Sequence, residues 1–338
     1  MRFFSWRCTI MLLLLMLLPL SGLLAVYHSS SELVRLRNAM VFHTITAAQA
    51  SWTPDNPPAG FRQENTTVPP YLAVLLSEKT TGDNLSQLLH HATMLNQHPR
   101  LGGPIQADTV STLHSIRNHG DGYCADFTQV TNALAYALNI PVREWGMSFD
   151  GFGGYGHAFN EIWDEQQQQW VMLDLFNSFY PVDVQSRQPL SALQFRQYLQ
   201  HNPQQIGIVR LSEEHFGFRD DNALLRYFQR GQEQFYLWWA NNSLSYDQHT
   251  LIAAARSISP HAEQLVAIVS GQFPALKAVV TSNNQAQIRA MQHLKILMWA
   301  IFWLELLLAL LLLCSLGGIL RNRIRRRKAR DLSREHKD

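Results

Sequence analysis

The chain of 338 residues is long enough for one or two domains, and its formal net charge of +2 hides a strong asymmetry. Residues 27–293 carry 16 Lys and Arg against 22 Asp and Glu, a net of −6, whereas residues 321–338 carry 9 against 3, a net of +6. The long central region is therefore mildly acidic, which excludes a nucleic-acid-binding surface. The basic tail is better explained as a signal for membrane orientation that also attracts anionic lipid.

The N-terminus holds an apolar segment, Ile10–Val26, which is preceded by Arg2 and Arg7. Such a segment is either a cleaved signal peptide or a membrane anchor. The small residues that a signal peptidase needs are poorly placed, because Leu23 and Ala25 are the best pair available. We therefore expect an uncleaved anchor.

The next stretch predicts a helix and then an irregular segment. We expect a helix over residues 29–50 that leaves the membrane, with Leu33, Leu36 and Met40 on its apolar side. This helix could hold the rest of the external region at a distance from the bilayer. Residues 52–70 contain five prolines, which predicts a linker or an extended wrapping segment.

Three short helices are expected before the first candidate functional residue, over residues 71–77, 85–95 and 108–116. This part of the chain is rich in histidine, at positions His90, His91, His98, His114 and His119. The spacing is irregular and no matching Cys or carboxylate pairs lie nearby, so we expect neither a metal site nor a cofactor.

Cys124 follows a loop rich in Gly and Asp and begins a helical pattern. Apolar residues recur at spacings of 3, 4 and 4 on one helix face, at Phe127, Val130, Leu134 and Leu138. The cysteine is therefore expected at a helix N-terminus. Free amide groups and the positive end of the helix dipole favour the thiolate over the thiol there.

Cys124 is also the only thiol of the central region, since Cys8 borders the first apolar segment and Cys314 lies inside a second one. It has no partner there for an intrachain disulfide. A free thiol in an oxidising compartment is either buried and inert or used chemically. The glycine-rich loop before Cys124 favours a chemical role for this thiol.

Strands are expected after the cysteine helix, over residues 142–145, 157–163 and 170–174, with a polar turn joining the last two. Residues 149–156 contain four glycines. A phosphate-binding loop would need a following helix and a Lys, which are absent, so we predict a mobile loop beside the next strand instead. Helices are expected through most of residues 189–290, over residues 191–199, 222–239, 247–258 and 261–269.

Two of these strands carry further candidate residues, His157 and Asp174. A thiolate, an imidazole and a carboxylate are the groups needed to attack an acyl carbon, to move the proton and to orient the base. Cys124, His157 and Asp174 are therefore the candidate catalytic residues.

A second apolar run, 296–320, is long enough to cross a membrane and is followed by the basic tail. Basic residues remain on the cytoplasmic side, so both termini are expected inside the cell and residues between the two segments outside. Glu305 lies within the second segment. A carboxyl at that depth either contacts a membrane-protein partner or sits protonated or near the interface.

The central pattern resembles the transglutaminase-like superfamily of papain-like cysteine enzymes. Four pieces carry the resemblance, in the same order: Gly122-x-Cys124 with Phe127, Asn139–Arg143, His157–Glu161 and Trp170–Asp174. The resemblance covers roughly residues 105–180. Phe159 stands where the family usually has Trp, and Leu175-Phe176 replaces the usual Pro-Thr.

The resemblance implies an α+β fold in which a helix carrying the cysteine packs on an antiparallel sheet, here with helical additions and two transmembrane helices. It implies Cys124 as nucleophile, His157 as base and then acid, and Asp174 as the residue that orients the imidazole. The Cys124 amide would stabilise the oxyanion. Asn118 is a weaker candidate for a second oxyanion donor.

The expected organisation has seven parts. These are a cytoplasmic N-terminus (1–9), a transmembrane helix (10–27), an external helical and linker region (28–104), the transglutaminase-like core (105–185), a second external helical region (186–293), a second transmembrane helix (294–320) and a basic cytoplasmic tail (321–338). This layout predicts a two-pass protein of a bacterial inner membrane with its main domain in the periplasm.

Two functions from different classes follow. The first is a cysteine-dependent enzyme that hydrolyses or transfers acyl groups at protein or peptide amides; the fold alone does not choose between these reactions. The second is an assembly or scaffold protein of the cell envelope, beside surface-polysaccharide machinery, that works mainly by binding. An intact set of Cys, His and Asp argues for the enzyme.

Overall fold

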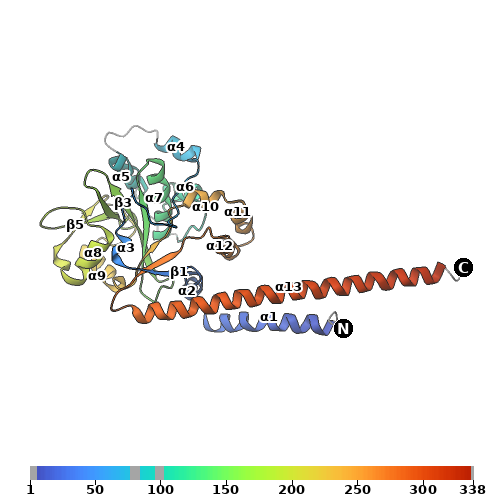
Figure 1. Cartoon of the computed structure of the whole chain (residues 1–338). Coiled ribbons are helices and arrows are strands. Elements are labelled where there is room, and N and C mark those ends of the chain that lie inside the picture. Colours follow the sequence, from blue (N-terminus) through green and yellow to red (C-terminus); the bar gives the residue numbers. More distant parts are fainter. Residues whose placement is uncertain (1–5, 77–83, 96–102, 336–338) are drawn as a thin grey trace.

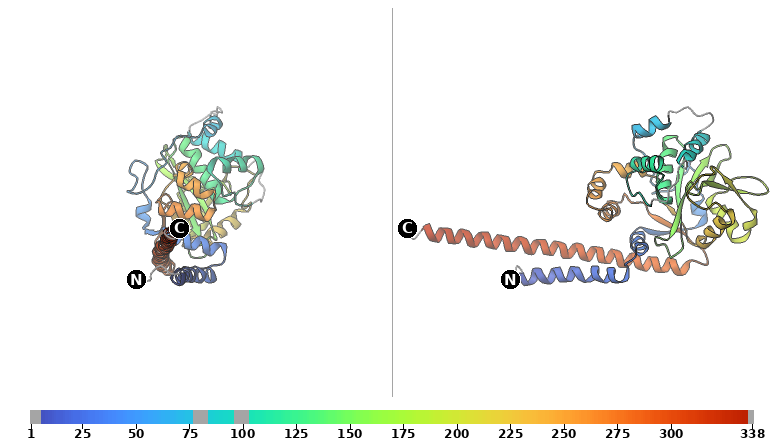
Figure 2. Two further views of the ribbon diagram at one scale, coloured as in Figure 1. Left: turned by 90° about the vertical axis from the view of Figure 1, so that its right-hand side faces the viewer. Right: turned by 180° about the vertical axis from the view of Figure 1, so that it is seen from behind.

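The protein consists of a folded core from which two long helices leave on the same side (Figure 1). The computed structural model describes residues 6–76, 84–95 and 103–335. The two helices are α1 (Trp6–Val26) and α13 (Gln285–Glu335), and Figure 2 shows them side by side from two further directions. Thr9 Oγ1 lies 2.9 Å from Ser315 Oγ, which joins them by a buried hydrogen bond.

Both helices are long and apolar enough to span a membrane, α1 over its whole length and α13 over residues 285–328. Their apolar side chains are largely uncovered by the rest of the protein, as Leu18 and Leu313 illustrate with exposed fractions of 70% and 66%. Exposed apolar surface of this extent is typical of a segment that contacts lipid.

A six-stranded sheet forms the centre of the core, in the order β1-β8-β7-β2-β3-β4. All neighbouring strands are antiparallel except β1 and β8, which are parallel. The strands are β1 (Phe42–Ile45), β2 (Val142–Ser148), β3 (Gly156–Asp164), β4 (Gln169–Leu173), β7 (Phe235–Trp238) and β8 (Leu276–Val279). The expected α+β core with a helix on an antiparallel sheet is thus present.

Helix α7 (Cys124–Ala137) packs on one face of this sheet because its apolar stripe meets alternate strand residues. Val130 and Leu134 lie in one buried cluster with Val142 and Ile162, which are register partners on β2 and β3. The opposite sheet face packs on α8 (Ala192–His201) and α9 (Asp221–Gly231) through large aromatic side chains. The alternation of strand side chains thus assigns each helix to one face.

The second face also buries an ion pair between residues of two of the sequence pieces that carry the family resemblance, 139–143 and 157–161. Arg143 Nε donates to Glu161 Oε2 at 2.5 Å, and both side chains are almost fully buried. The guanidinium also donates to the carbonyl of Ala50 at 2.7 Å and lies over the ring of Trp170. Glu161 Oε1 accepts from the amide of Ala192 at 2.6 Å, so neither buried charge is left unpaired.

Smaller elements surround the sheet. They are α2 (Ser30–Met40), α3 (Ala47–Ala50), α4 (Pro70–Leu76), α5 (Asn84–Leu95), α6 (Thr109–His119), α10 (Ser243–Gln248), α11 (Thr250–Arg256), α12 (Pro260–Val269), the 3-10 turn η1 (Pro203–Gln205) and the hairpin of β5 (Phe179–Asp183) with β6 (Ile206–Arg210). The three short helices expected before Cys124 are α4, α5 and α6. The proline-rich stretch before α4 is irregular, and its Trp52 and Phe61 pack against the core.

Two helical predictions were wrong. The single helix expected over residues 29–50 ends at Met40, and β1 follows it as an edge strand of the sheet. The expected helix over 222–239 ends at Gly231, and Phe235–Trp238 forms the central strand β7. In both cases a run of β-branched or aromatic residues pairs with a distant strand, and tertiary pairing overrides the local helical pattern.

Helix α2, which was expected to hold the core away from the membrane, packs directly on the core. Leu36, Ala39 and Met40 are buried, and the N-cap Ser29 and Glu32 form a capping box at its start. The chain therefore passes from the first apolar helix into the core within a few residues.

Candidate active site

Cys124 is the first residue of α7 and follows the N-cap residue Tyr123, whose backbone is extended. The carboxylate of Asp126 accepts from the amide of Tyr123 at 2.7 Å and from the amide of Ile105 at 3.2 Å. Gly122 has a φ of 120° and faces the side chain of Ile116, so glycine is required at this turn. These contacts fix the thiol at the helix start, as the sequence predicts.

His157 and Asp174 lie beside this helix start on β3 and just beyond β4. His157 Nε2 is 2.7 Å from Asp174 Oδ2, and both side chains are almost fully buried. Burial alone would lower the pKa of His157, but the charges of Asp174 and Cys124 and hydrogen bonds to both raise it well above its ordinary value. The structure thus brings the three predicted residues together and favours a charged imidazole next to the thiol.

Asn177 is a fourth member of this group that the sequence analysis did not identify. Its Nδ2 donates to Asp174 Oδ2 at 2.7 Å and lies 3.3 Å from His157 Nε2. Its Oδ1 accepts from the amide of Phe218 at 2.9 Å, which fixes the orientation of the amide group. The available signal was its position three residues after Asp174, since its own amide closes a turn on Asp174 Oδ1 at 3.1 Å.

Aromatic rings enclose the imidazole on several sides. Phe159 stacks on His157, while Phe176, Tyr227 and Phe228 meet it edge to face. Tyr227 and Phe228 belong to α9, which lies outside the stretch that carries the family resemblance. These rings restrict the rotation of the imidazole and exclude water from its contact with Asp174.

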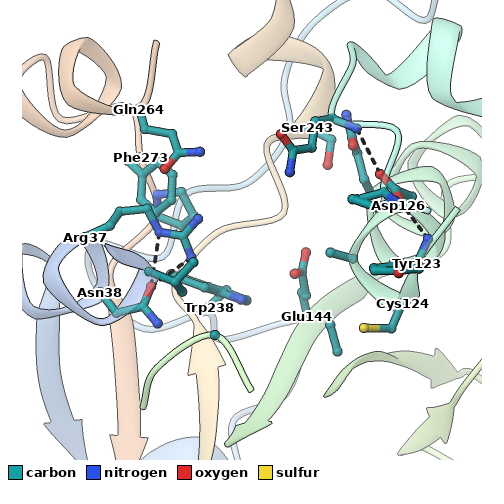
Figure 3. A pocket seen from close by; sticks show the side chains of 18 of the residues that line it. Arg37, Asn38, Tyr123, Cys124, Asp126, Glu144, Trp238, Ser243, Gln264 and Phe273 are labelled. Carbon is teal, nitrogen blue, oxygen red and sulfur yellow. Dashed lines mark hydrogen bonds between the residues drawn. The ribbon is translucent and has the colours of Figure 1, made fainter. Parts of the chain in front are cut away.

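Cys124 and His157 line a cleft of about 660 Å³. Its walls come from α7 and β3, from β7, from α2, and from α10, α11 and α12. Figure 3 shows Cys124 on one side of this cleft, Arg37 and Trp238 on the other, and Glu144 between them. Most of the walls opposite the thiol are therefore built by segments distant from it in the sequence.

Glu144 projects from β2 into the middle of the cleft. Asn132 Nδ2 donates to Glu144 Oε2 at 3.0 Å. Burial raises the pKa of Glu144 to about 7, although the hydrogen bond from Asn132 acts in the opposite direction. This carboxyl is therefore only partly ionised at neutral pH, which the sequence analysis did not foresee.

The glycine-rich segment before His157, which was expected to be a mobile loop, is anchored to α2 by several hydrogen bonds. Ser31 of α2 donates through its hydroxyl to Asp150, and the amide of Gly154 donates back to the Ser31 hydroxyl at 2.8 Å. Asn38 Nδ2 donates to the carbonyl of Phe152 at 2.9 Å, and the Phe152 ring is fully buried. The glycines allow this close approach of α2, since a Cβ at Gly154 would lie 2.9 Å from the Ser31 backbone.

Asn118 lies at an exposed position near the end of α6 and is not among the residues that line the cleft. The geometry therefore gives no support to its predicted role as an oxyanion donor. The first amide groups of a helix have no intrahelical acceptor, so the N–H of Cys124 is available for that role.

The histidine-rich stretch has other structural roles where it is described. His114 stacks on Tyr71 with ring centroids 3.9 Å apart, and His90 contacts His91 edge to face. His98 lies outside the described residues. Within the described ranges, no group of three His, Cys, Asp or Glu side chains is arranged to hold a metal ion.

Comparison with known proteins gives one match. Residues 78–175 match the family model of the transglutaminase-like superfamily, a range that contains Cys124, His157 and Asp174. The matched range ends before Asn177, α9 and β7. No curated protein and no solved structure matches the chain.

Proposed function

Because this chain contains a domain of the transglutaminase-like superfamily, we propose that it is a cysteine-dependent enzyme acting on protein or peptide amides. The observation that carries the proposal is the contact of Asp174 with His157 beside a cysteine at a helix start, in the wall of a cleft. Such a constellation suits acyl transfer through a covalent intermediate.

In the proposed reaction, the thiolate of Cys124 attacks the amide carbonyl and the oxygen takes up negative charge. The N–H of Cys124 donates to this oxyanion. Since His157 Nε2 is held by Asp174, its Nδ1 carries the proton that passes to the leaving amine. The C–N bond then breaks, which leaves an acyl thioester on Cys124 and a neutral imidazole.

A second nucleophile completes the cycle. Neutral His157 removes a proton from water or from an amine, the nucleophile attacks the thioester carbonyl, and the C–S bond breaks. Water gives a carboxylic acid and an amine gives a new amide, while thiolate and imidazolium are restored. Supplying an amine such as a lysine derivative and measuring its incorporation by mass spectrometry separates transfer from hydrolysis.

The test of the proposal is alkylation of Cys124 by iodoacetamide as a function of pH, in a chain with Cys8 and Cys314 changed to Ser. We expect rapid labelling near neutral pH that collapses in His157→Ala, because the imidazolium stabilises the thiolate. His119→Ala, which removes an exposed histidine of α6, is the matched control and should label normally.

A free thiol has a pKa of about 8.5. Labelling that rises only near that pH would contradict the proposal that the chain is a cysteine-dependent enzyme. The same conclusion would follow if His157→Ala made no difference. The remaining function would then be that of an envelope scaffold that works by binding.

The proposed location is an inner membrane of a bacterium, crossed by α1 and α13, with the core in the periplasm and both termini in the cytoplasm. The basic tail after α13 supports this orientation. A membrane-impermeant maleimide should label Val184→Cys, which is exposed on the core, in intact cells but should not label Arg327→Cys in the tail. The reverse pattern would contradict this orientation.

A membrane-protein partner at Glu305 is part of the same proposal. Glu305 Oε1 is buried and has no hydrogen-bond partner among the described residues. A carboxyl in that position needs a donor, which a neighbouring helix of another protein supplies. More of such a partner should co-purify with Glu305→Gln than with Glu305→Leu. Equal co-purification with the two variants would argue against a partner contact at Glu305.

A further inference from the structure

Arg37 lies in the wall of the proposed catalytic cleft and forms no salt bridge with a carboxylate of the described residues. It lines the side opposite Cys124 (Figure 3). The cleft contains another arginine, Arg256, but that residue is paired with Asp247 at 2.8 Å and with Glu263 at 3.0 Å. In the part of the chain that the structure describes, no such ion pair involves Arg37.

The protein holds the guanidinium of Arg37 in one orientation. Nε and Nη2 both donate to Asn38 Oδ1, at 3.2 and 2.9 Å. Asn38 is itself buried and fixed by its bond to the carbonyl of Phe152. The guanidinium also lies over the ring of Phe273, with 5.2 Å between its central carbon and the ring centroid. Among the described residues, Nη1 has no acceptor.

Glu144 does not neutralise this cation. Its charge acts on Arg37, but these two described side chains form no salt bridge with each other. One Glu144 oxygen already accepts from Asn132, and the raised pKa of Glu144 keeps the group partly protonated at neutral pH. A half-buried guanidinium that the protein leaves unpaired is costly unless a ligand pairs with it.

We infer that Arg37 binds a carboxylate of the acyl substrate, at the end of the cleft remote from Cys124. This inference deepens the proposed function and rests on it. The planar guanidinium matches a carboxylate in geometry and charge. Because Glu144 lies between Arg37 and Cys124 (Figure 3), the carboxylate and the reacting carbonyl are separated by several bonds, as in a peptide.

The test measures binding separately from catalysis, with the full-length Cys124→Ala protein in lipid nanodiscs and isothermal titration calorimetry. The probes are N-acetyl-glutaminyl peptides extended by zero to three glycines, each with a free C-terminal carboxylate or a carboxamide. A third set ends in an amidated glutamate, which distinguishes a side-chain carboxylate from a terminal one.

We expect one spacer length to bind about tenfold or more tightly as the carboxylate than as the carboxamide. Arg37→Gln should remove this preference, whereas Arg37→Lys should retain part of it because the charge remains. Arg226→Gln, which removes an exposed arginine of α9, is the matched control for net charge and should leave the preference unchanged.

Equal binding of carboxylate and carboxamide at every spacer length would overturn the inference, as would absence of binding by all probes. A preference that survives Arg37→Gln in a protein with an unchanged melting temperature would do the same. Failure of Cys124 alkylation in the wild type, together with an Arg37-dependent carboxylate preference, would overturn catalysis and leave the binding site standing.

Discussion

The two halves of the cleft differ in origin. The side that carries Cys124, His157 and Asp174 lies within the stretch that matches a known family, and it is built from one helix and its neighbouring strands. The opposite side comes from α2, β7 and α10 to α12, which lie outside that stretch. Under the proposed function, the chemistry belongs to the matched half, and the carboxylate site inferred at Arg37 belongs to elements outside the matched stretch.

The largest effect is expected at Asp174, in the matched half. Asp174→Asn removes the charge that raises the pKa of His157, so less imidazolium and less thiolate persist at neutral pH. By analogy with other triads, amide turnover should fall by about a thousandfold to ten-thousandfold. The pH profile of Cys124 alkylation by iodoacetamide should shift to higher pH as well, and an unchanged profile would remove Asp174 from the site.

The next effect tests whether α9, outside the matched stretch, is only structural. Phe228 is fully buried and contacts His157, Phe159 and Phe195, so Phe228→Ala should cost about 3–5 kcal/mol of stability. Phe195→Ala is the control, because Phe195 lies in the same cluster but its ring contacts among the described residues are to Phe179 and Phe228 and not to His157. Only Phe228→Ala should also change the pH profile of alkylation, and identical profiles would limit α9 to a packing role.

Glu144 predicts a pH dependence of stability. Burial raises its pKa to about 7 in the folded protein from an ordinary value of 4.5, so the folded state binds more protons than the unfolded state between pH 4.5 and pH 7. Stability should therefore fall as pH rises from 4.5 to 7, by about 1–3 kcal/mol. Glu144→Gln should flatten this slope in urea unfolding, whereas the exposed Glu165→Gln should not.

The smallest effect is expected at Asn177, which lies two residues beyond the matched stretch. Asn177→Ala removes one hydrogen bond to Asp174 but leaves the contact between Asp174 and His157 in place. We expect about a tenfold loss of kcat with little change in KM, since Asn177 positions Asp174 and does not line the cleft. Asn177→Asp should be worse, because it places a second carboxylate against Asp174, and equal activities would contradict the positioning role.

Local patterns were sufficient to predict the nucleophilic half of the site. The period of Phe127, Val130 and Leu134 located the helix start at Cys124, and alternation located the strands that bear His157 and precede Asp174. Each of these patterns extends over no more than about fifteen consecutive residues, and hydrophobic periodicity predicts secondary structure over windows of this length.

The other half depends on contacts between distant segments, and no local pattern encodes those. β1 pairs in parallel with β8, more than two hundred residues away, and β7 is four residues long. The position of Arg37 opposite Cys124 follows from the docking of α2 on the glycine-rich segment before His157. The sequence around Arg37 is typical of a surface helix, so the position of Arg37 in the cleft wall was not predictable from it.

Helix α13 runs from the folded core to Glu335 without a break. It has 51 residues, which corresponds to a rod about 75 Å long. Near its start, Lys295 Nζ donates to the carbonyl of Phe42 at 2.7 Å and Trp299 Nε1 to that of Met40 at 2.9 Å. These bonds join the rod to the end of α2 and to the start of β1, so the helix that carries Arg37 is fixed directly to the rod.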